Sequence, residues 1–192
     1  MVIGAVMGLI GLRGALAFAE TGEAQIRGTS DDSTVSGYVR FTETPAGLEF
    51  VAQLEGAPAG KHGIHIHQFG SCGGAGKAAG NHFNPDGVQH GAVERDGLTL
   101  SHPGDFGNIE AGPDGRGSLS GFAPGVALVR GTYAVAGRAV VLHEQADDFS
   151  QPAGNAGERI GCGPIVITGD DAPPAPAAEA PAQAPANKKG AR

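Results

Sequence analysis

Short runs in which hydrophobic and polar residues alternate recur along the chain, separated by stretches rich in glycine, asparagine and proline. Alternation with a period of two is typical of strands that bury one face. The alternation is clearest over 35–42, and the run 63–69 contains β-branched residues. We predict strands at 24–27, 35–42, 48–54, 63–69, 107–110, 118–120, 138–143 and 165–168, with a hairpin turn at Pro113-Asp114-Gly115.

The segment 70–104 breaks this pattern, because it shows no periodicity and is full of turn-forming residues. Loops of this length in compact domains are usually functional or disordered. This one contains three histidines, so we expect it to be functional. Glycine accounts for 34 of the 192 residues, aromatics for only 5%, and tryptophan is absent. This composition and the short strands predict an all-β sandwich or barrel rather than a helical bundle.

Both ends of the chain differ from its middle. Residues 2–12 are apolar and Ala17-Phe18-Ala19 precedes Glu20, a pattern typical of a secretory signal peptide with its cleavage site. The run is too short to predict a transmembrane helix, although an uncleaved membrane-proximal segment is the alternative. Residues 172–186 are almost wholly alanine and proline. We therefore predict a signal peptide at 1–19, one domain at 20–169 and a disordered tail at 170–192.

The net charge argues against one class of partner, and the cysteine content bears on the cellular compartment. The formal net charge is −7 and no basic stripe is visible in the sequence, which argues against nucleic acid as a partner. The two cysteines, Cys72 and Cys162, are an even number in a chain predicted to be exported, so we expect them to pair. Two free buried thiols are the alternative.

Six of the seven histidines lie in short segments that suggest a metal site. Imidazole is a ligand for both copper and zinc. His65 and His67 are two apart on a predicted strand, so their side chains share a face and can reach one ion. His62 is three residues from His65 and points elsewhere. We interpret it as a structural histidine with backbone partners.

The remaining histidines suggest a second ion beside the first. His82, His90, His102 and Asp105 would form a closed set of the kind that a structural zinc requires. A copper site needs several imidazoles and an open face, and His65, His67 and His143 supply three imidazoles. His82 could serve both ions if its ring bridges them.

Five motifs resemble those of the copper/zinc superoxide dismutase family, of the bacterial exported type, and the similarity extends over residues 24–169. The motifs are H-G-I-H-I-H-Q-F-G at 62–70, G-N-H-F-N-P at 80–85, H-P-G-D-F-G-N at 102–108, V-L-H-E-Q-A-D-D at 141–148 and G-N-A-G-E-R-I-G-C-G at 154–163. The resemblance implies a Greek-key β-barrel with long metal-binding loops.

The resemblance also implies a role for each residue of the site. It assigns copper to His65, His67, His82 and His143, and zinc to His82, His90, His102 and Asp105. Asp147 would hydrogen-bond His65 and His90, Arg159 would lie above the copper and attract the anionic substrate, and Cys72 and Cys162 would form the family's disulfide.

The activity implied is the disproportionation of superoxide to O2 and hydrogen peroxide by Cu(II)/Cu(I) cycling, with zinc in a structural role and His82 as a proton carrier. Family members often have lysines in the loop before Arg159 that steer superoxide. Here residues 149–158 contain no lysine and Glu158 is acidic, so we expect weaker steering.

Alternative functions remain open at this point. A non-catalytic copper/zinc-binding protein on the same scaffold would be expected to lack a copper ligand or Arg159. A chaperone domain for a dismutase would be expected to lack copper ligands and to carry a C-x-x-C motif. A hydrolytic metalloenzyme would need a free carboxylate base at the histidines. We expect a periplasmic or extracellular location, and a homodimer is one of the assemblies that the family allows.

Overall fold

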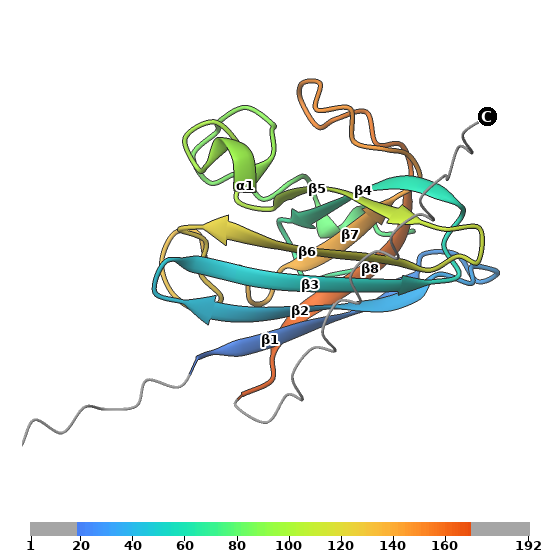
Figure 1. The fold of residues 1–192 in the computed structure, drawn as a ribbon, viewed down its shortest axis with the longest axis horizontal. Coiled ribbons are helices and arrows are strands. Elements are labelled where there is room, and N and C mark those ends of the chain that lie inside the picture. The colour runs from blue at the N-terminus through green and yellow to red at the C-terminus, as the bar shows by residue number, and fades with distance from the viewer. Residues whose placement is uncertain (1–18, 170–192) are drawn as a thin grey trace, which may run out of the picture.

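The computed structural model describes residues 19–169, so the signal peptide and the tail predicted from the sequence lie, apart from Ala19, outside the described residues. Eight antiparallel strands close into a barrel in the order β1-β2-β3-β6-β5-β4-β7-β8 (Figure 1). They are β1 (Thr21–Gly28), β2 (Ser36–Thr44), β3 (Gly47–Glu55), β4 (Gly60–His67), β5 (Asp105–Ala111), β6 (Gly117–Pro124), β7 (Ala139–His143) and β8 (Arg159–Ile167).

All eight predicted strands are present, which confirms the all-β prediction. The last strand begins six residues earlier than predicted, at Arg159. The first part of this strand was not predicted because glycine and proline are rare inside strands, and it contains Gly161, Gly163 and Pro164. The predicted turn lies between β5 and β6, where Gly115 has a φ of 76° and its N–H donates to the Gly112 carbonyl at 2.9 Å.

The connections confirm the Greek-key topology that the resemblance implies. Strands β4, β5 and β6 are neighbours in sequence and in space, and β7 returns to lie beside β4 rather than β6. This is the 4-1-2-3 order of a Greek key. The return places β4 between β5 and β7, so the histidines of β4 and His143 at the end of β7 come from adjacent strands.

The barrel interior is a continuous apolar core. Phe50 and Phe106 stack inside it with ring centroids 4.0 Å apart. Its largest fully buried apolar side chains are Ile26, Phe41, Leu48, Leu54, Ile64, Ile66, Ile109, Leu128, Leu142 and Ile165. Burial of each such side chain stabilises the fold by about 1.5–3 kcal/mol. The core thus fixes the strands from which the histidines project.

Strand β4 is buried on both faces from His62 to His67. Ile64 and Ile66 belong to the apolar core, whereas His65 and His67 lie on the outer face and are covered by loops. The covering segment crosses β4 closely at Gly104, whose carbonyl accepts the N–H of Ile66 at 3.0 Å. A Cβ at residue 104 would lie 2.5 Å from the Cβ of Ile66, so only glycine fits this crossing.

The segment between β4 and β5 is irregular as predicted, apart from the 3-10 helix η1 (Lys77–Ala79) and the one-turn helix α1 (Val93–Asp96). In Figure 1, α1 and the loop between β7 and β8 project from the same side of the barrel. Within residues 19–169, no helix is long and apolar enough to cross a bilayer.

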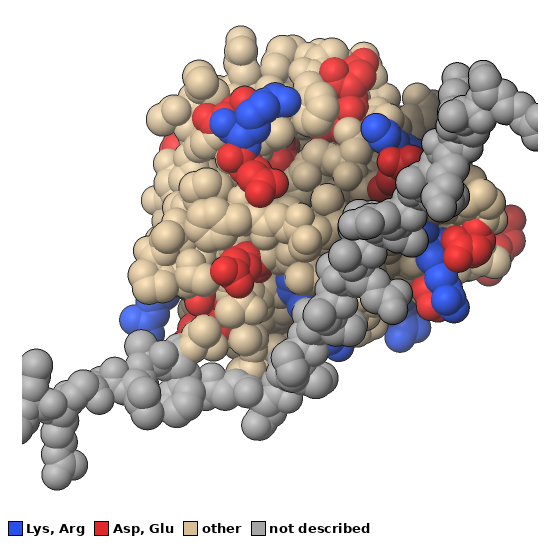
Figure 2. Space-filling model, in the orientation of Figure 1, with Lys and Arg blue, Asp and Glu red and all other residues tan. Residues whose placement is uncertain are grey.

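Charged side chains are dispersed over the face of the barrel that Figure 2 shows. Lys and Arg lie interspersed with Asp and Glu there, without gathering over one strand. The described part of this face therefore offers no continuous basic surface.

Candidate metal centre

Strand β4 positions the first two histidines, as the spacing predicted. His65 and His67 are fully buried on the outer face of the strand. The β4–β5 pairing is irregular between Gly63 and His65, and the β7–β8 pairing between Leu142 and His143. Such bulges are frequent beside active sites, because they redirect a side chain. His143 reaches the same place from β7, and its ring centroid lies 5.0 Å from that of His65.

The long segment delivers the other ligands. An isolated bridge joins His82 to His67, and the N–H of Phe83 donates to the Ile66 carbonyl at 2.9 Å. Phe83 lies beneath the guanidinium of Arg138, 3.4 Å from its ring centroid. These contacts fix His82 against β4. Asp105 opens β5 directly opposite His65.

The first group consists of four imidazoles, and three of them are oriented by a hydrogen bond through one ring nitrogen. Nε2 of His65 donates to Asp147 at 2.9 Å, Nδ1 of His67 donates to the Gly80 carbonyl at 3.0 Å, and Nδ1 of His143 donates to the Gly157 carbonyl at 3.2 Å. The opposite nitrogens converge: Nε2 of His67 lies 3.3 Å from Nε2 of His143. Such second hydrogen bonds orient metal-ligating histidines. The group is His65, His67, His82 and His143.

The second group combines three imidazoles with one carboxylate. Asp105 lies 3.2 Å from Nδ1 of His82, 2.9 Å from Nδ1 of His90 and 3.0 Å from Nδ1 of His102. Backbone N–H groups of Gly91 and His102 also donate to Asp105, which holds the carboxylate in place. A buried set of three nitrogens and one carboxylate oxygen suits tetrahedral zinc. The group is His82, His90, His102 and Asp105.

His82 belongs to both groups. Its Nδ1 faces Asp105, and its ring centroid lies 4.2 Å from that of His65 and 4.9 Å from that of His67. The donor set fits two ions because Nδ1 of His65 and Nδ1 of His90 are buried and neither makes a hydrogen bond of normal geometry, although Nδ1 of His90 lies 2.9 Å from Asp105. A buried polar atom without a partner is costly, so these two nitrogens are the atoms expected to bind metal.

The pKa values of the histidines are shifted in opposite directions by burial and by the neighbouring carboxylates. Burial lowers the pKa of His67 to about 2, of His82 to about 4 and of His143 to about 3. These rings are therefore neutral at pH 7, the form that binds metal. For His90, burial lowers the pKa, but the carboxylates of Asp105 and Asp147, each 2.9 Å from a ring nitrogen, outweigh it and raise the value to about 9. Hydrogen bonds from the histidines outweigh burial to hold the pKa of Asp105 below its usual range.

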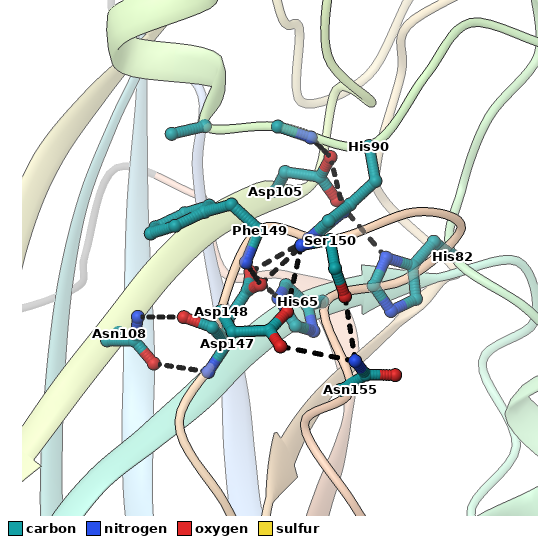
Figure 3. Close-up of polar contacts among 12 residues, drawn as sticks. His65, His82, His90, Asp105, Asn108, Asp147, Asp148, Phe149, Ser150 and Asn155 are labelled. Carbon is teal, nitrogen blue, oxygen red and sulfur yellow. Dashed lines mark hydrogen bonds and ion pairs between the residues drawn. The ribbon is translucent and has the colours of Figure 1, made fainter.

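Asp147 hydrogen-bonds one histidine of each group, as Figure 3 shows. Its carboxylate accepts from Nε2 of His65 at 2.9 Å and from Nε2 of His90 at 2.9 Å. Asn108 holds Asp147 through two backbone bonds: Nδ2 donates to the Asp147 carbonyl at 2.9 Å, and the Asp147 N–H donates to Oδ1 at 2.7 Å. His65, His90 and Asp147 also form a third compact group, but both ring nitrogens that face Asp147 are already occupied by these hydrogen bonds.

Arg159 lines a groove of about 700 Å³ together with His67, His82 and His143. Its guanidinium is fixed by donating to the carbonyls of Gly76 and Gly80, both at 2.6 Å. Burial lowers the pKa of Arg159, but arginine stays cationic near neutral pH. The groove is thus open toward the four-histidine group and carries a fixed positive charge.

The disulfide between Cys72 and Cys162 is present, with an S–S distance of 2.06 Å and a Cα–Cα distance of 5.7 Å. It ties the start of the long segment to β8, the strand that begins with Arg159. The prediction for His62 is also confirmed. Its ring is buried between the His143 carbonyl at 2.9 Å and the Pro58 carbonyl at 2.8 Å, apart from both groups.

The structure therefore brings all the predicted ligand residues together in two adjacent groups. The sequence did not identify the carbonyls of Gly80 and Gly157 or the side chain of Asn108. Carbonyls carry no sequence signal, because every residue has one. Asn108 lies inside the motif at 102–108, which was the available signal.

An eight-stranded Greek-key barrel with two histidine groups that share one ring defines a class of proteins that binds two metals. The family model for copper/zinc superoxide dismutase (SODC) matches residues 35–165. The chain belongs to the copper/zinc superoxide dismutase family.

Individual relatives agree with this assignment. The extracellular superoxide dismutase [Cu-Zn] of Caenorhabditis elegans is 38% identical over 136 residues, which are 67% of this chain and 60% of that protein. The protein of the same name from Drosophila melanogaster is 39% identical over 147 residues, 72% of this chain and 79% of that protein. The superoxide dismutase [Cu-Zn] of Onchocerca volvulus is 37% identical over 146 residues, 70% of this chain and 90% of that protein.

A solved structure confirms the fold. The crystal structure of the clock protein EA4 superimposes with a TM-score of 0.68 at 30% sequence identity, and the match covers 82% of this chain and 100% of that one. The chain thus resembles this solved structure over all of that protein's length.

Proposed function

We propose that this protein is a superoxide dismutase, which converts two superoxide anions and two protons to one O2 and one hydrogen peroxide. The observation that carries the proposal is the position of His82, whose ring lies between a four-histidine group, with His67 and His143 on the groove, and a second group completed by buried Asp105, of which His102 also borders the groove. One ring shared by an open and a closed site suits a redox metal beside a structural one.

The donor atoms fit a specific division of the two metals. The open group would hold copper through Nδ1 of His65 and through the converging Nε2 atoms of His67 and His143, with His82 as fourth ligand. The closed group would hold zinc through His82, His90, His102 and Asp105. Asp147 would orient His65 and His90 through their Nε2 atoms.

Bound copper would supply one-electron redox chemistry at the groove, whereas zinc, which has no redox activity, would fix the His82 ring. Arg159 attracts superoxide and holds it beside the open group, because its charge is fixed by the carbonyls of Gly76 and Gly80. His82 holds a proton at Nε2 and delivers it to the reduced oxygen, while its Nδ1 stays directed at the Asp105 side.

We also propose that the protein works in the periplasm or outside the cell. The disulfide supports export, because such bonds persist in oxidising compartments. Two relatives are described as extracellular. A homodimer stays a prediction, supported by the exposed apolar side chains of Val166 and Ile167 on β8.

Metal analysis combined with a superoxide-consumption assay tests the proposal. The purified full chain should bind one copper and one zinc and should consume superoxide, and His82→Ala should disturb both metals, whereas His102→Ala should weaken mainly zinc. Gln25→Ala is the matched control, because Gln25 is exposed on β1 and belongs neither to the two groups nor to the groove lining. A chain that takes up only zinc after copper loading, or that binds both metals without consuming superoxide, would contradict the proposal.

A further inference from the structure

The loop between β7 and β8 lies against the backbone of His90, a residue outside any helix or strand. Residues 149–158 of this loop contain no lysine that could steer superoxide, so these residues have no role assigned so far. Residues without regular secondary structure must find other partners for their N–H and carbonyl groups. For His90 both partners come from one side chain of this loop.

That side chain is Gln151. Its Oε1 accepts the N–H of His90 at 2.9 Å, and its Nε2 donates to the His90 carbonyl at 2.8 Å. The amide therefore pairs with His90 as a neighbouring strand would. Among the described residues, no other hydrogen bond to these two backbone groups is present. Gln151 thus fixes the backbone position from which the imidazole projects.

Phe149 acts on the ring of the same histidine. Its ring stacks on that of His90, with centroids 6.5 Å apart and an angle of 19° between the planes. The guanidinium of Arg95 lies 5.1 Å from the Phe149 ring centroid, which holds the phenyl ring between a cation and an imidazole (Phe149 and His90 are labelled in Figure 3). Phe149 has a φ of 60°, unfavourable for a bulky residue, and its N–H is held by Asp147 at 2.8 Å. The loop adopts this conformation where it contacts the ring.

We propose that Gln151 and Phe149 are positioning residues for the zinc ligand His90, and that the short loop without lysines serves to retain zinc. The inference rests on the proposed zinc site. With its backbone paired to Gln151, its ring stacked on Phe149 and its Nε2 bonded to Asp147, His90 keeps Nδ1 directed at Asp105 before any ion arrives. A ligand held in its binding orientation loses less freedom on binding metal, and its metal leaves more slowly.

Zinc release from the full-length, metal-loaded protein tests the proposal. Transfer of zinc to a chromogenic chelator should accelerate about 10- to 100-fold in Gln151→Ala, the range typical of groups that support metal ligands. Gln151→Glu keeps the size and the acceptor but loses the donor to the His90 carbonyl, so it should also accelerate release. Phe149→Ala should accelerate release, and Phe149→Tyr, which retains the stacked ring, should restore the rate. Gln25→Ala, at an exposed glutamine of β1 that does not line the groove, should release zinc at the unaltered rate.

A spectroscopic measurement separates positioning from general loss of structure. With Co(II) in place of zinc, the visible absorption bands should shift in Gln151→Ala and Phe149→Ala, while the absorption of the copper site stays unchanged. Release rates within twofold of the unaltered protein together with unchanged cobalt bands would overturn the inference. If the unaltered protein bound no zinc, the proposed metal centre itself would fail. If Gln151→Ala does not fold, Gln151→Glu and Phe149→Ala test the same prediction, with Phe149→Tyr as the variant that should keep the unaltered rate.

Discussion

The disulfide between Cys72 and Cys162 both stabilises the barrel and fixes the guanidinium of Arg159. The bridge closes a loop of 90 residues. Chain entropy assigns a loop of that size about 4–5 kcal/mol of stability. In a domain of this size, about 1 kcal/mol shifts Tm by about 2–4 °C, so removing both cysteines should lower Tm by about 8–20 °C. Replacing both, as Cys72→Ala with Cys162→Ala, avoids a stray thiol.

The same change should also lower activity. The guanidinium of Arg159 is held by the carbonyls of Gly76 and Gly80, which lie four and eight residues after Cys72. Without the bridge this segment is tied to β8 through Arg159 itself, so the guanidinium loses its fixed position. We expect superoxide consumption at low salt to fall toward that of an Arg159→Ala protein, with both metals still bound.

Thermal unfolding of the metal-loaded proteins and a superoxide assay on matched samples measure both effects. Chemically reduced wild-type protein is the control and should behave as the double variant does. A Tm change below about 2 °C would refute the entropic argument. A large Tm change with an unaltered rate would show that Arg159 keeps its position without the bridge.

Three further predictions follow from the site. Arg159→Glu should slow superoxide consumption roughly tenfold or more at unchanged metal content, and Arg159→Lys should slow it less. Glu158→Gln should raise the rate slightly at low salt. Equal rates for wild type and Arg159→Glu would contradict this prediction. A Cβ at Gly154 would lie 1.8 Å from Oδ1 of Asp147, so Gly154→Ala should reduce both metal contents and stability by about 1–3 kcal/mol in urea unfolding. Gly131→Ala, also at positive φ but in open space, is its control, and equal losses in the two would refute the contact.

The last of the three concerns pH. In the metal-free protein the pKa of His90 is raised to about 9, so the ring carries a proton at pH 7 that zinc must displace from Nδ1. Zinc binding should therefore release a proton, and affinity should fall roughly tenfold for each pH unit below 9. Copper uptake should release no proton from His67 or His143, since their lowered pKa values leave them neutral, whereas His82 must give up its remaining N–H proton when its ring binds both ions. Calorimetry in buffers of different ionisation enthalpy counts the protons, and zinc binding without proton release would contradict the assignment.

Much of the fold could be predicted from the sequence because strands that bury one face must alternate polar and apolar residues. Strand β8 was found only in part, since Gly161, Gly163 and Pro164 interrupt its pattern while its neighbours still hold it in the barrel. The metal ligands were predictable because imidazole and carboxylate are chemically distinctive and β4 places two of them on one face. Gln151 and Phe149 were not, because their roles depend on where a loop folds back onto His90.

The most direct test of the account is to locate the metals by anomalous diffraction from crystals of the metal-loaded protein at the copper and zinc absorption edges. The account predicts two ions on opposite sides of His82. Copper should lie among His65, His67 and His143, and zinc among His90, His102 and Asp105. A single ion, or zinc in both positions after copper loading under oxidising conditions, would contradict it.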